Sequence, residues 1–278
     1  MEKYIIKLLG KSLNVISYIS SNYAANKALH IFSKPRKGKL NQKNKAFLSS
    51  ANKENLFYED LEIATYHWKG NKATILLAHG WESNAARWQR KIKSFIKEDF
   101  NIIALDAPAH GASGGKLFNA LLYSEFINIV AQKYQPQIII GHSVGGMALV
   151  FFQQKYKLQS LQKIILLGAP SEFEGILKDY IKLLGYNKKI EKNLKRIIIE
   201  RFGSEPSDFS TSKFAKEITA DGLIIHDTHD NVIPYSDAKL IEKELKGSKL
   251  VSTKGLGHSL NDQSVTKTIL DFIKEDNK

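Results

Sequence analysis

The 278-residue chain contains no cysteine. This absence excludes a disulfide framework, a thiolate metal site and a thiol nucleophile. Long apolar runs are also missing, since no segment approaches the roughly 18 to 20 apolar residues that span a bilayer. The N-terminal run YIIKLLGKSLNVISYI is interrupted by Lys7, Gly10, Lys11 and Asn14, which argues against a cleaved signal peptide. We therefore expect a cytoplasmic protein.

Acidic residues are scarce at one end of the chain. Residues 1–53 hold eleven Lys and Arg against one Glu, and residues 54–278 are nearly neutral at +3, so a basic N-terminal arm carries most of the net charge of +13. Apolar residues between Ile5 and Ile19 recur at i+3 and i+4 spacing, which predicts a partly amphipathic helix followed by a solvated loop.

We expect this helix to dock on the body of the protein. The alternative is peripheral contact with the anionic inner surface of a membrane. Nucleic acid is not an expected partner, because the basic excess is confined to the arm.

From about residue 56, short β-branched or apolar runs alternate with longer amphipathic segments, which is typical of an α/β fold with a mostly parallel central sheet flanked by helices. The strand at 61–68 is expected at an edge or antiparallel, joined by the turn at Gly70-Asn71 to the next strand. The remaining strands are expected at 73–80, 100–107, 137–143, 162–170, 221–227 and 249–253. Helices are expected at 117–134, 144–156, 236–246 and from about 263.

Between Pro170 and Ala220 the alternation stops, and the segment is mainly helical in pattern. We expect it to be a short cap inserted over the strand ends, where it roofs a pocket. The predicted organisation is a basic helix and arm at 1–53, a core at 54–170 and 220–278, and a helical cap insertion at 171–219.

The segment QIIIGHSVGGMALV contains a G-x-S-x-G pattern around Ser143, between an apolar strand and an apolar helix. This is the setting of a nucleophile elbow, in which Gly141 and Gly145 allow the strand and helix to approach while the serine hydroxyl projects at the sheet edge. The alternative is a glycine-rich turn with an ordinary N-cap serine.

A serine hydroxyl needs a base and an orienting carboxylate, and both follow in the chain. His258 lies in the glycine-rich segment GLGHSL after a predicted strand. The segment HDTHDNVIP offers Asp227 and Asp230, and we choose Asp230 because it lies in the loop beyond the strand end, before Pro234. The rival interpretation of this segment is a His-Asp metal cluster, for which a suitably spaced ligand set is missing.

Together, LLAHGWES, LDAPAHGAS, GHSVGG, HDTHDNVIP and GLGHS resemble the α/β-hydrolase superfamily over about residues 61–278, in a bacterial branch of single-domain serine hydrolases. The resemblance implies Ser143 as nucleophile, Asp230 as acid and His258 as base. It also implies an oxyanion hole formed by the backbone N–H groups of Trp81 and Val144.

The resemblance implies acyl transfer without a metal or organic cofactor, and a serine at the elbow argues against the dehalogenase and epoxide hydrolase branches. We expect a carboxylesterase-like enzyme that cleaves small to medium esters or thioesters. Trp81, Trp88 and Tyr235 are candidates to line its pocket, although such aromatic residues are more often core. The alternatives are a membrane-surface lysophospholipase or monoacylglycerol-type lipase, and a ligand-binding member of the fold without catalysis.

Overall fold

The structure is a computed structural model that describes residues 2–275. By packing, the chain divides into two compact units, each described by itself. Unit 1 comprises the residues up to Lys34 together with Glu172–Ser210, and unit 2 comprises Pro35–Ser171 and the residues from Thr211 onward. Within the described residues, no helix combines the length and apolar content that a bilayer crossing requires.

Unit 1 is helical. Its helices are α1 (Glu2–Ile19), α2 (Ser21–Ser33), α7 (Phe173–Leu184) and α8 (Lys188–Phe202). They enclose a small apolar core that includes Leu13, Leu29 and Leu194. Asn14 joins α1 to the turn between α7 and α8, because its side chain donates to the carbonyl of Gly185 at 2.8 Å and accepts from the amide of Asn187 at 2.9 Å. The N-terminal helices thus pack with the insertion.

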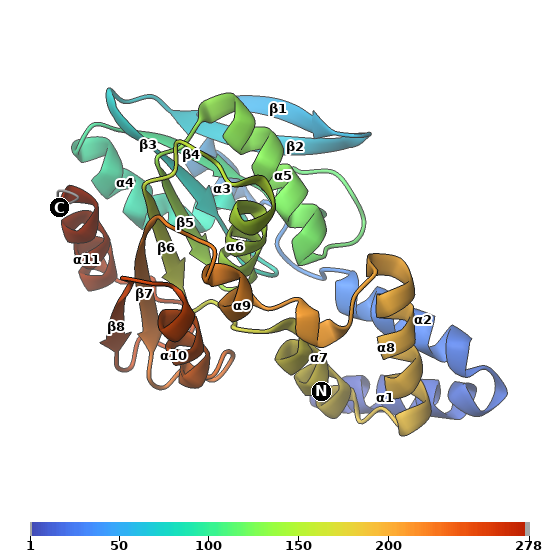
Figure 1. Cartoon of the computed structure of the whole chain (residues 1–278). Coiled ribbons are helices and arrows are strands. Elements are labelled where there is room, and N and C mark those ends of the chain that lie inside the picture. Colours follow the sequence, from blue (N-terminus) through green and yellow to red (C-terminus); the bar gives the residue numbers. More distant parts are fainter. Residues whose placement is uncertain (1, 276–278) are drawn as a thin grey trace. The chain divides into compact units, whose positions relative to one another are not determined.

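Unit 2 contains an eight-stranded sheet in the order β1-β2-β4-β3-β5-β6-β7-β8 (Figure 1). Strands β3 to β8 are parallel to one another, and β1 and β2 are antiparallel to their neighbours. The strands are β1 (Asn52–Tyr58), β2 (Leu61–Trp68), β3 (Lys72–Ala78), β4 (Phe100–Leu105), β5 (Ile138–His142), β6 (Lys163–Leu167), β7 (Asp221–Asp227) and β8 (Lys249–Thr253). The predicted α/β fold with a mostly parallel sheet is confirmed.

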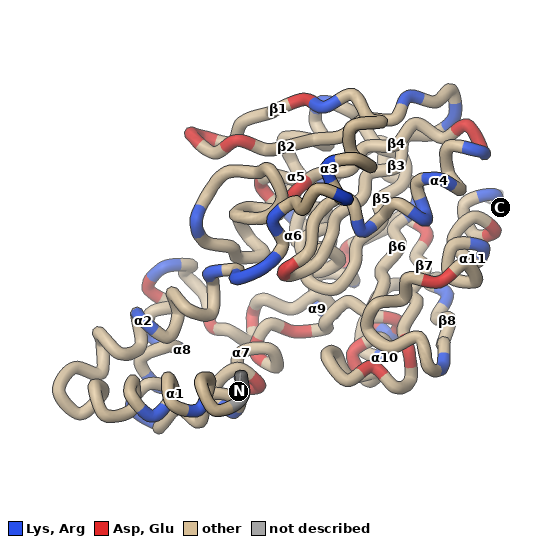
Figure 2. Tube along the Cα trace, turned by 180° about the vertical axis from the view of Figure 1, so that it is seen from behind, with Lys and Arg blue, Asp and Glu red and all other residues tan. Residues whose placement is uncertain are grey.

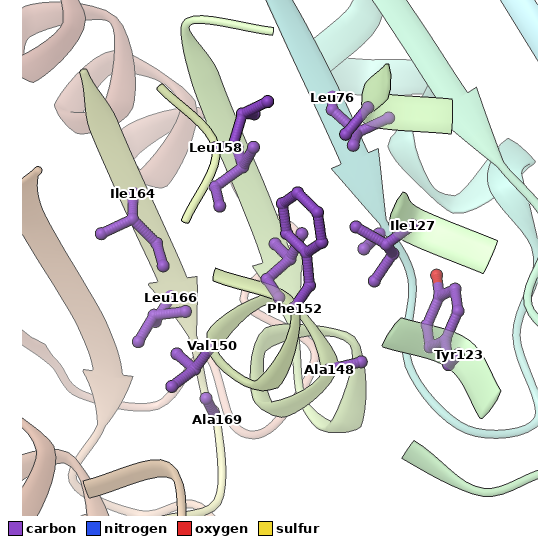
Figure 3. Packing of buried hydrophobic residues seen from close by; sticks show 14 of the residues in the cluster. Leu76, Tyr123, Ile127, Ala148, Val150, Phe152, Leu158, Ile164, Leu166 and Ala169 are labelled. Carbon is purple, nitrogen blue, oxygen red and sulfur yellow. The ribbon is translucent and has the colours of Figure 1, made fainter. Parts of the chain in front are cut away.

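Helices cover both faces of this sheet, because alternate strand residues point to opposite sides. Leu76 faces a core shared with α5 (Ala120–Tyr134) and α6 (Val144–Tyr156), and Figure 3 shows Tyr123, Ile127 and Phe152 of these helices packed there. Ile75 faces the core on the opposite side of the sheet.

The remaining helices of unit 2 are α3 (Gln42–Leu48), α4 (Gln89–Lys97), α9 (Thr211–Ala215), α10 (Tyr235–Glu244) and α11 (Gln263–Lys274), together with the 3-10 turn η1 (Ala85–Trp88). A second 3-10 turn, η2 (Pro206–Asp208), belongs to unit 1.

The expectations about the first strands are met in part. β2 is antiparallel to both of its neighbours, which is one of the two alternatives predicted for it, and β1 occupies the edge outside it. The turn at Gly70-Asn71 does not join neighbouring strands, since β2 pairs with β4 and β3 lies between β4 and β5. The polar sequence of β1, NKENLFY, is exposed at alternate positions, as suits an edge strand, and gave no strand signal.

Candidate active site

Ser143 lies between β5 and α6, in the tight turn that follows the carboxyl end of β5. Figure 1 shows these two elements at the centre of unit 2. The backbone of Ser143 has φ +54° and ψ −131°, a conformation that residues other than glycine rarely adopt. Close packing surrounds this turn: a Cβ at Gly145 would lie 2.4 Å from the carbonyl oxygen of His79, and a Cβ at Gly141 would lie 2.5 Å from Cα of Gly146. Both glycines are therefore sterically required.

Ser143 does not act as an ordinary helix cap. An N-cap serine has extended backbone angles, and its hydroxyl accepts a hydrogen bond from an amide of the first turn. Ser143 has a positive φ, and its side chain makes no capping hydrogen bond. The hydroxyl is therefore not used to cap the helix. A strained backbone of this kind is typical of a turn that exposes a functional side chain.

His258 and Asp230 are brought together from loops that follow β8 and β7. His258 donates from Nδ1 to Oδ2 of Asp230 at 2.8 Å, because a carboxylate only accepts. The other carboxylate oxygen accepts from the amides of Val232 at 2.8 Å and Ile233 at 3.0 Å. The Asp230 side chain is fully buried, and 19% of the His258 side chain is exposed. With Nδ1 protonated, Nε2 of the imidazole keeps a lone pair that can accept a proton.

Asp227 has a different task from Asp230. Its carboxylate accepts from the amides of His229, Gly255 and Leu256 and from the hydroxyl of Thr253. These hydrogen bonds outweigh burial and lower the pKa of Asp227 to about 2. Asp227 therefore ties the loop after β7 to the start of the loop that carries His258.

The loop after β3 carries one of the two expected oxyanion donors and passes close to the elbow. A Cβ at Gly80 would lie 2.9 Å from Nδ1 of His142 and 3.0 Å from Cβ of Ser143, so a side chain larger than that of glycine would crowd the serine. Trp81 follows Gly80, and Val144 begins α6. Within residues 2–275, the backbone amides of Trp81 and Val144 donate to no protein group, so both remain available to a ligand.

Buried polar residues hold that loop in place. His79 donates from Nδ1 to the Gly80 carbonyl and accepts the amide of Ala107 at Nε2, and burial lowers its pKa to about 3, so it stays neutral. Asp106 accepts the amide of Ala85 at 2.8 Å, and Nε2 of His110 accepts the amide of Glu82 at 3.0 Å. These side chains serve as supports for the loop.

The three aromatic pocket candidates differ in their surroundings. Trp81 is half-buried and packs edge-on against His110 and Phe118, and Tyr235 is half-buried with its hydroxyl bonded to Ser252. Trp88 is only 1% exposed and lies in the core on the α4 and α11 face of the sheet. Its side chain offers no surface to a substrate, so Trp88 is a core residue, as the alternative held, and is not part of a pocket wall.

His226 and His229 do not form a metal site with the aspartates. His226 donates from Nε2 to the carbonyl of Ile233 at 3.0 Å and lies 3.3 Å from Oδ2 of Asp230. Within the described chain, no group of three or more His, Cys, Asp or Glu side chains is arranged to hold a metal ion.

Arg87 and Lys91 also reach the loop of His258, although neither belongs to a motif of the sequence. Arg87 donates to the carbonyl of Ser259 and Lys91 to that of Leu260. Their partners lie about 170 residues downstream, so no local pattern marks these two residues.

Two protein families match parts of this chain. Residues 69–195 match the family described as serine aminopeptidase S33, and residues 203–277 match a family described as TAP-like protein. The first match includes Ser143, and the second includes Asp230 and His258.

Individual relatives align over most of this chain. A bifunctional esterase/perhydrolase from Acinetobacter calcoaceticus is 23% identical over 79% of this chain and 96% of its own length. A monoacylglycerol lipase from Mycolicibacterium smegmatis is 24% identical over 73% of this chain and 86% of its own. Among solved structures, an esterase from Exiguobacterium antarcticum superimposes with a TM-score of 0.60, at 18% identity, over 77% of this chain and 96% of that chain. A bromoperoxidase from Bacillus anthracis gives a TM-score of 0.63, at 16% identity, over 81% of this chain and all of that chain.

Proposed function

We propose that this chain, which belongs to the α/β-hydrolase superfamily and is a serine hydrolase of that fold, cleaves a carboxylic ester or thioester of a small to medium acyl group. Ser143 is the proposed nucleophile, His258 the base and Asp230 the orienting acid. The relatives support the choice of an ester, since their names include esterases and lipases.

One observation carries this proposal: the 2.8 Å hydrogen bond from His258 to Asp230 forms at the same sheet edge as the strained turn of Ser143. The parallel strands β5, β7 and β8 end at this edge, and the loops after them carry the three residues. A base oriented by a buried carboxylate near a presented hydroxyl is the arrangement that serine acyl transfer requires.

The proposed reaction proceeds in two steps. Oγ of Ser143 attacks the acyl carbonyl while Nε2 of His258 takes its proton, and the same imidazole then protonates the leaving group. The amides of Trp81 and Val144 stabilise the negative charge on the carbonyl oxygen, and one such donor typically contributes about 3 to 4 kcal/mol. Water then attacks the acyl-enzyme with His258 as base. Trp81 and Tyr235 are the proposed pocket walls.

A panel of p-nitrophenyl esters from acetate to palmitate tests this function. We expect kcat/KM to be highest for short or medium acyl chains, and one fluorophosphonate adduct per molecule in the intact mass. Turnover of peptide amides alone would overturn the ester assignment. Absence of both turnover and adduct would instead favour a ligand-binding protein without catalysis.

A second candidate function is a lysophospholipase or monoacylglycerol-type lipase that works at a membrane surface. It is favoured by the α1 stripe, which we define as the exposed apolar residues of that helix. Their exposed fractions run from 61% to 90%, and the stripe consists of Tyr4, Ile5, Leu8, Val15, Tyr18 and Ile19. Residues 4, 8, 15 and 19 recur at helical spacing and so share one side of α1.

The basic side chains beside the α1 stripe indicate what kind of surface it binds. Lys7 and Lys11 are exposed on the same helix, and Nζ of Lys189 lies 4.3 Å from the ring centre of Tyr18; Figure 2 shows Lys positions along α1. Two-fold pairing of this face with a second copy would bring lysine against lysine. An anionic lipid surface instead matches both the apolar stripe and its basic flank.

Vesicle sedimentation tests the second candidate. We expect the protein to bind vesicles of equal phosphatidylcholine and phosphatidylglycerol, to bind phosphatidylcholine alone more weakly, and to be released by salt. Leu8→Asp should reduce binding about tenfold, because it places a charge among the apolar groups that enter the lipid surface. The matched control is Phe57→Asp, at an apolar side chain of β1 that is 60% exposed, and it should bind as the wild type does. A dimer that Leu8→Asp dissociates, without vesicle binding, would contradict a lipid partner.

A further inference from the structure

Three consecutive carbonyls in the loop of His258 each accept a hydrogen bond from a side chain elsewhere in unit 2. Nε2 of His142 donates to the carbonyl of His258 itself at 2.8 Å. A nitrogen of the Arg87 guanidinium donates to the carbonyl of Ser259 at 3.0 Å, and Nζ of Lys91 donates to that of Leu260 at 3.2 Å. The donors come from the elbow and from the segment of η1 and α4, so they tie the loop to two separate elements.

Two of these donors, Arg87 and Lys91, are cationic side chains that are partly or fully removed from solvent. Lys91 is only 2% exposed, and burial lowers its pKa to about 7. Arg87 is half-buried, and desolvation lowers its pKa to about 10. Within the described residues neither forms an ion pair with a carboxylate, and both lie over the ring of the buried Trp88. The charge of Asp262 offsets part of the cost of burying Lys91, but no carboxylate of the described chain contacts either cation, which indicates that the carbonyls they hold matter.

The loop itself has little regular structure to fix its path. Residues 254–262 belong to neither a helix nor a strand, and Leu260 is fully buried with φ +47°, in the left-handed region that leucine rarely adopts. On the side before His258, Asp227 accepts the amides of Gly255 and Leu256. After His258, Arg87 and Lys91 donate to the next two carbonyls of the loop. His258 therefore lies between two segments that hydrogen bonds hold in place.

We propose that Arg87 and Lys91 are positioning residues that set the location of the His258 imidazole by holding the carbonyls of Ser259 and Leu260. This inference rests on the proposed function, in which His258 is the base. Neither residue touches the reacting atoms. Each acts on the orientation of the imidazole toward Ser143, for which a shift of about 1 Å is enough to cost roughly 100-fold in rate.

The experiment measures how fast a fluorophosphonate labels Ser143 in the 278-residue chain. We expect Arg87→Met and Lys91→Met each to slow labelling about 10- to 100-fold, because each removes a donor and keeps the apolar stem. For ester hydrolysis, kcat should fall by a similar factor while KM changes little. The matched control is Arg90→Met, which removes an exposed cation from the same helix and should label at the wild-type rate.

A double-mutant cycle separates positioning from general destabilisation. In a His258→Ala background, Lys91→Met should change the residual labelling rate by less than about twofold, because there is no imidazole left to misplace. Thermal unfolding of each variant shows that the labelled protein is folded. An unchanged labelling rate in both single variants, or an equal loss in the His258→Ala background, would overturn the proposal.

These outcomes are distinct from failure of the proposed function. If the wild type neither takes a fluorophosphonate adduct nor hydrolyses an ester, His258 is not a base for Ser143, and the inference falls with that function. If the wild type reacts and the Met variants react equally fast, only the positioning of His258 by Arg87 and Lys91 is wrong.

Discussion

Ser143→Ala is expected to remove ester hydrolysis, with kcat falling about 10⁴-fold or more, because no other group at the site can form the acyl-enzyme. His258→Ala should cost a comparable factor, since the hydroxyl of Ser143 then has no base to take its proton. Initial rates with the best p-nitrophenyl ester measure both losses. Intact mass after fluorophosphonate treatment should show one adduct on the wild type, none on Ser143→Ala and a much slower reaction of His258→Ala.

Ser94→Ala is the control for this experiment, because it removes a half-buried serine hydroxyl of α4 that donates only to the carbonyl of Arg90 in the same helix. It should keep both the rate and the single adduct. The expected stability change for Ser143→Ala is small, since the hydroxyl makes no capping hydrogen bond. An adduct that persists in Ser143→Ala would place the reactive group elsewhere and reject the elbow as the active site.

Ser143 and Asp230 of the candidate site could be predicted from the sequence because each follows a strand whose apolar pattern is strong. The runs QIII and GLII are apolar enough to mark buried parallel strands, and in such a sheet the carboxyl ends meet at one edge. The choice of Asp230 over Asp227 needed only the position of each along the loop. In the structure Asp230 bonds to His258, whereas Asp227 bonds to backbone amides.

Other features could not be read from local patterns, for physical reasons. β1 is an exposed edge strand, so burial does not impose an apolar alternation on it. The order of β2, β4 and β3 depends on pairing between strands that are distant in sequence. Arg87 and Lys91 appear in the sequence as ordinary basic residues near the start of a helix, and only the folded chain brings them to Ser259 and Leu260. The packing of α1 and α2 with residues 172–210 is likewise a tertiary property.

Asp230→Asn should lower kcat about 10⁴-fold at neutral pH while the protein stays folded. In the variant, the amide oxygen can still accept from Val232 and Ile233, as Oδ1 does now. The amide nitrogen then replaces Oδ2 and donates toward Nδ1 of His258. This favours the tautomer with the proton on Nε2, which cannot take the proton of Ser143. The measurement is kcat with the ester, normalised to the folded fraction from circular dichroism.

Asp227→Asn is the matched control, since it makes the same change three residues earlier, at the end of β7. Asp227 holds backbone amides, so its loss should destabilise the fold by about 2 kcal/mol and lower kcat per folded molecule by no more than about tenfold. The two variants thus separate orientation of the base from support of the loop. Equal losses of kcat in both would contradict the distinct roles of the two aspartates.

The pH dependence of unfolding tests the role of Asp227 independently of kcat. The pKa of Asp227 is about 2 in the folded protein, below the ordinary value of 3.8, so the folded state favours the ionised carboxylate. Its contribution is therefore fully present above about pH 4 and is lost as the pH falls toward 2. Asp227→Asn should remove this part of the acid destabilisation, so the wild type and the variant converge in stability near pH 2. Divergence at low pH would show that Asp227 is not the carboxylate whose protonation loosens the loop of His258.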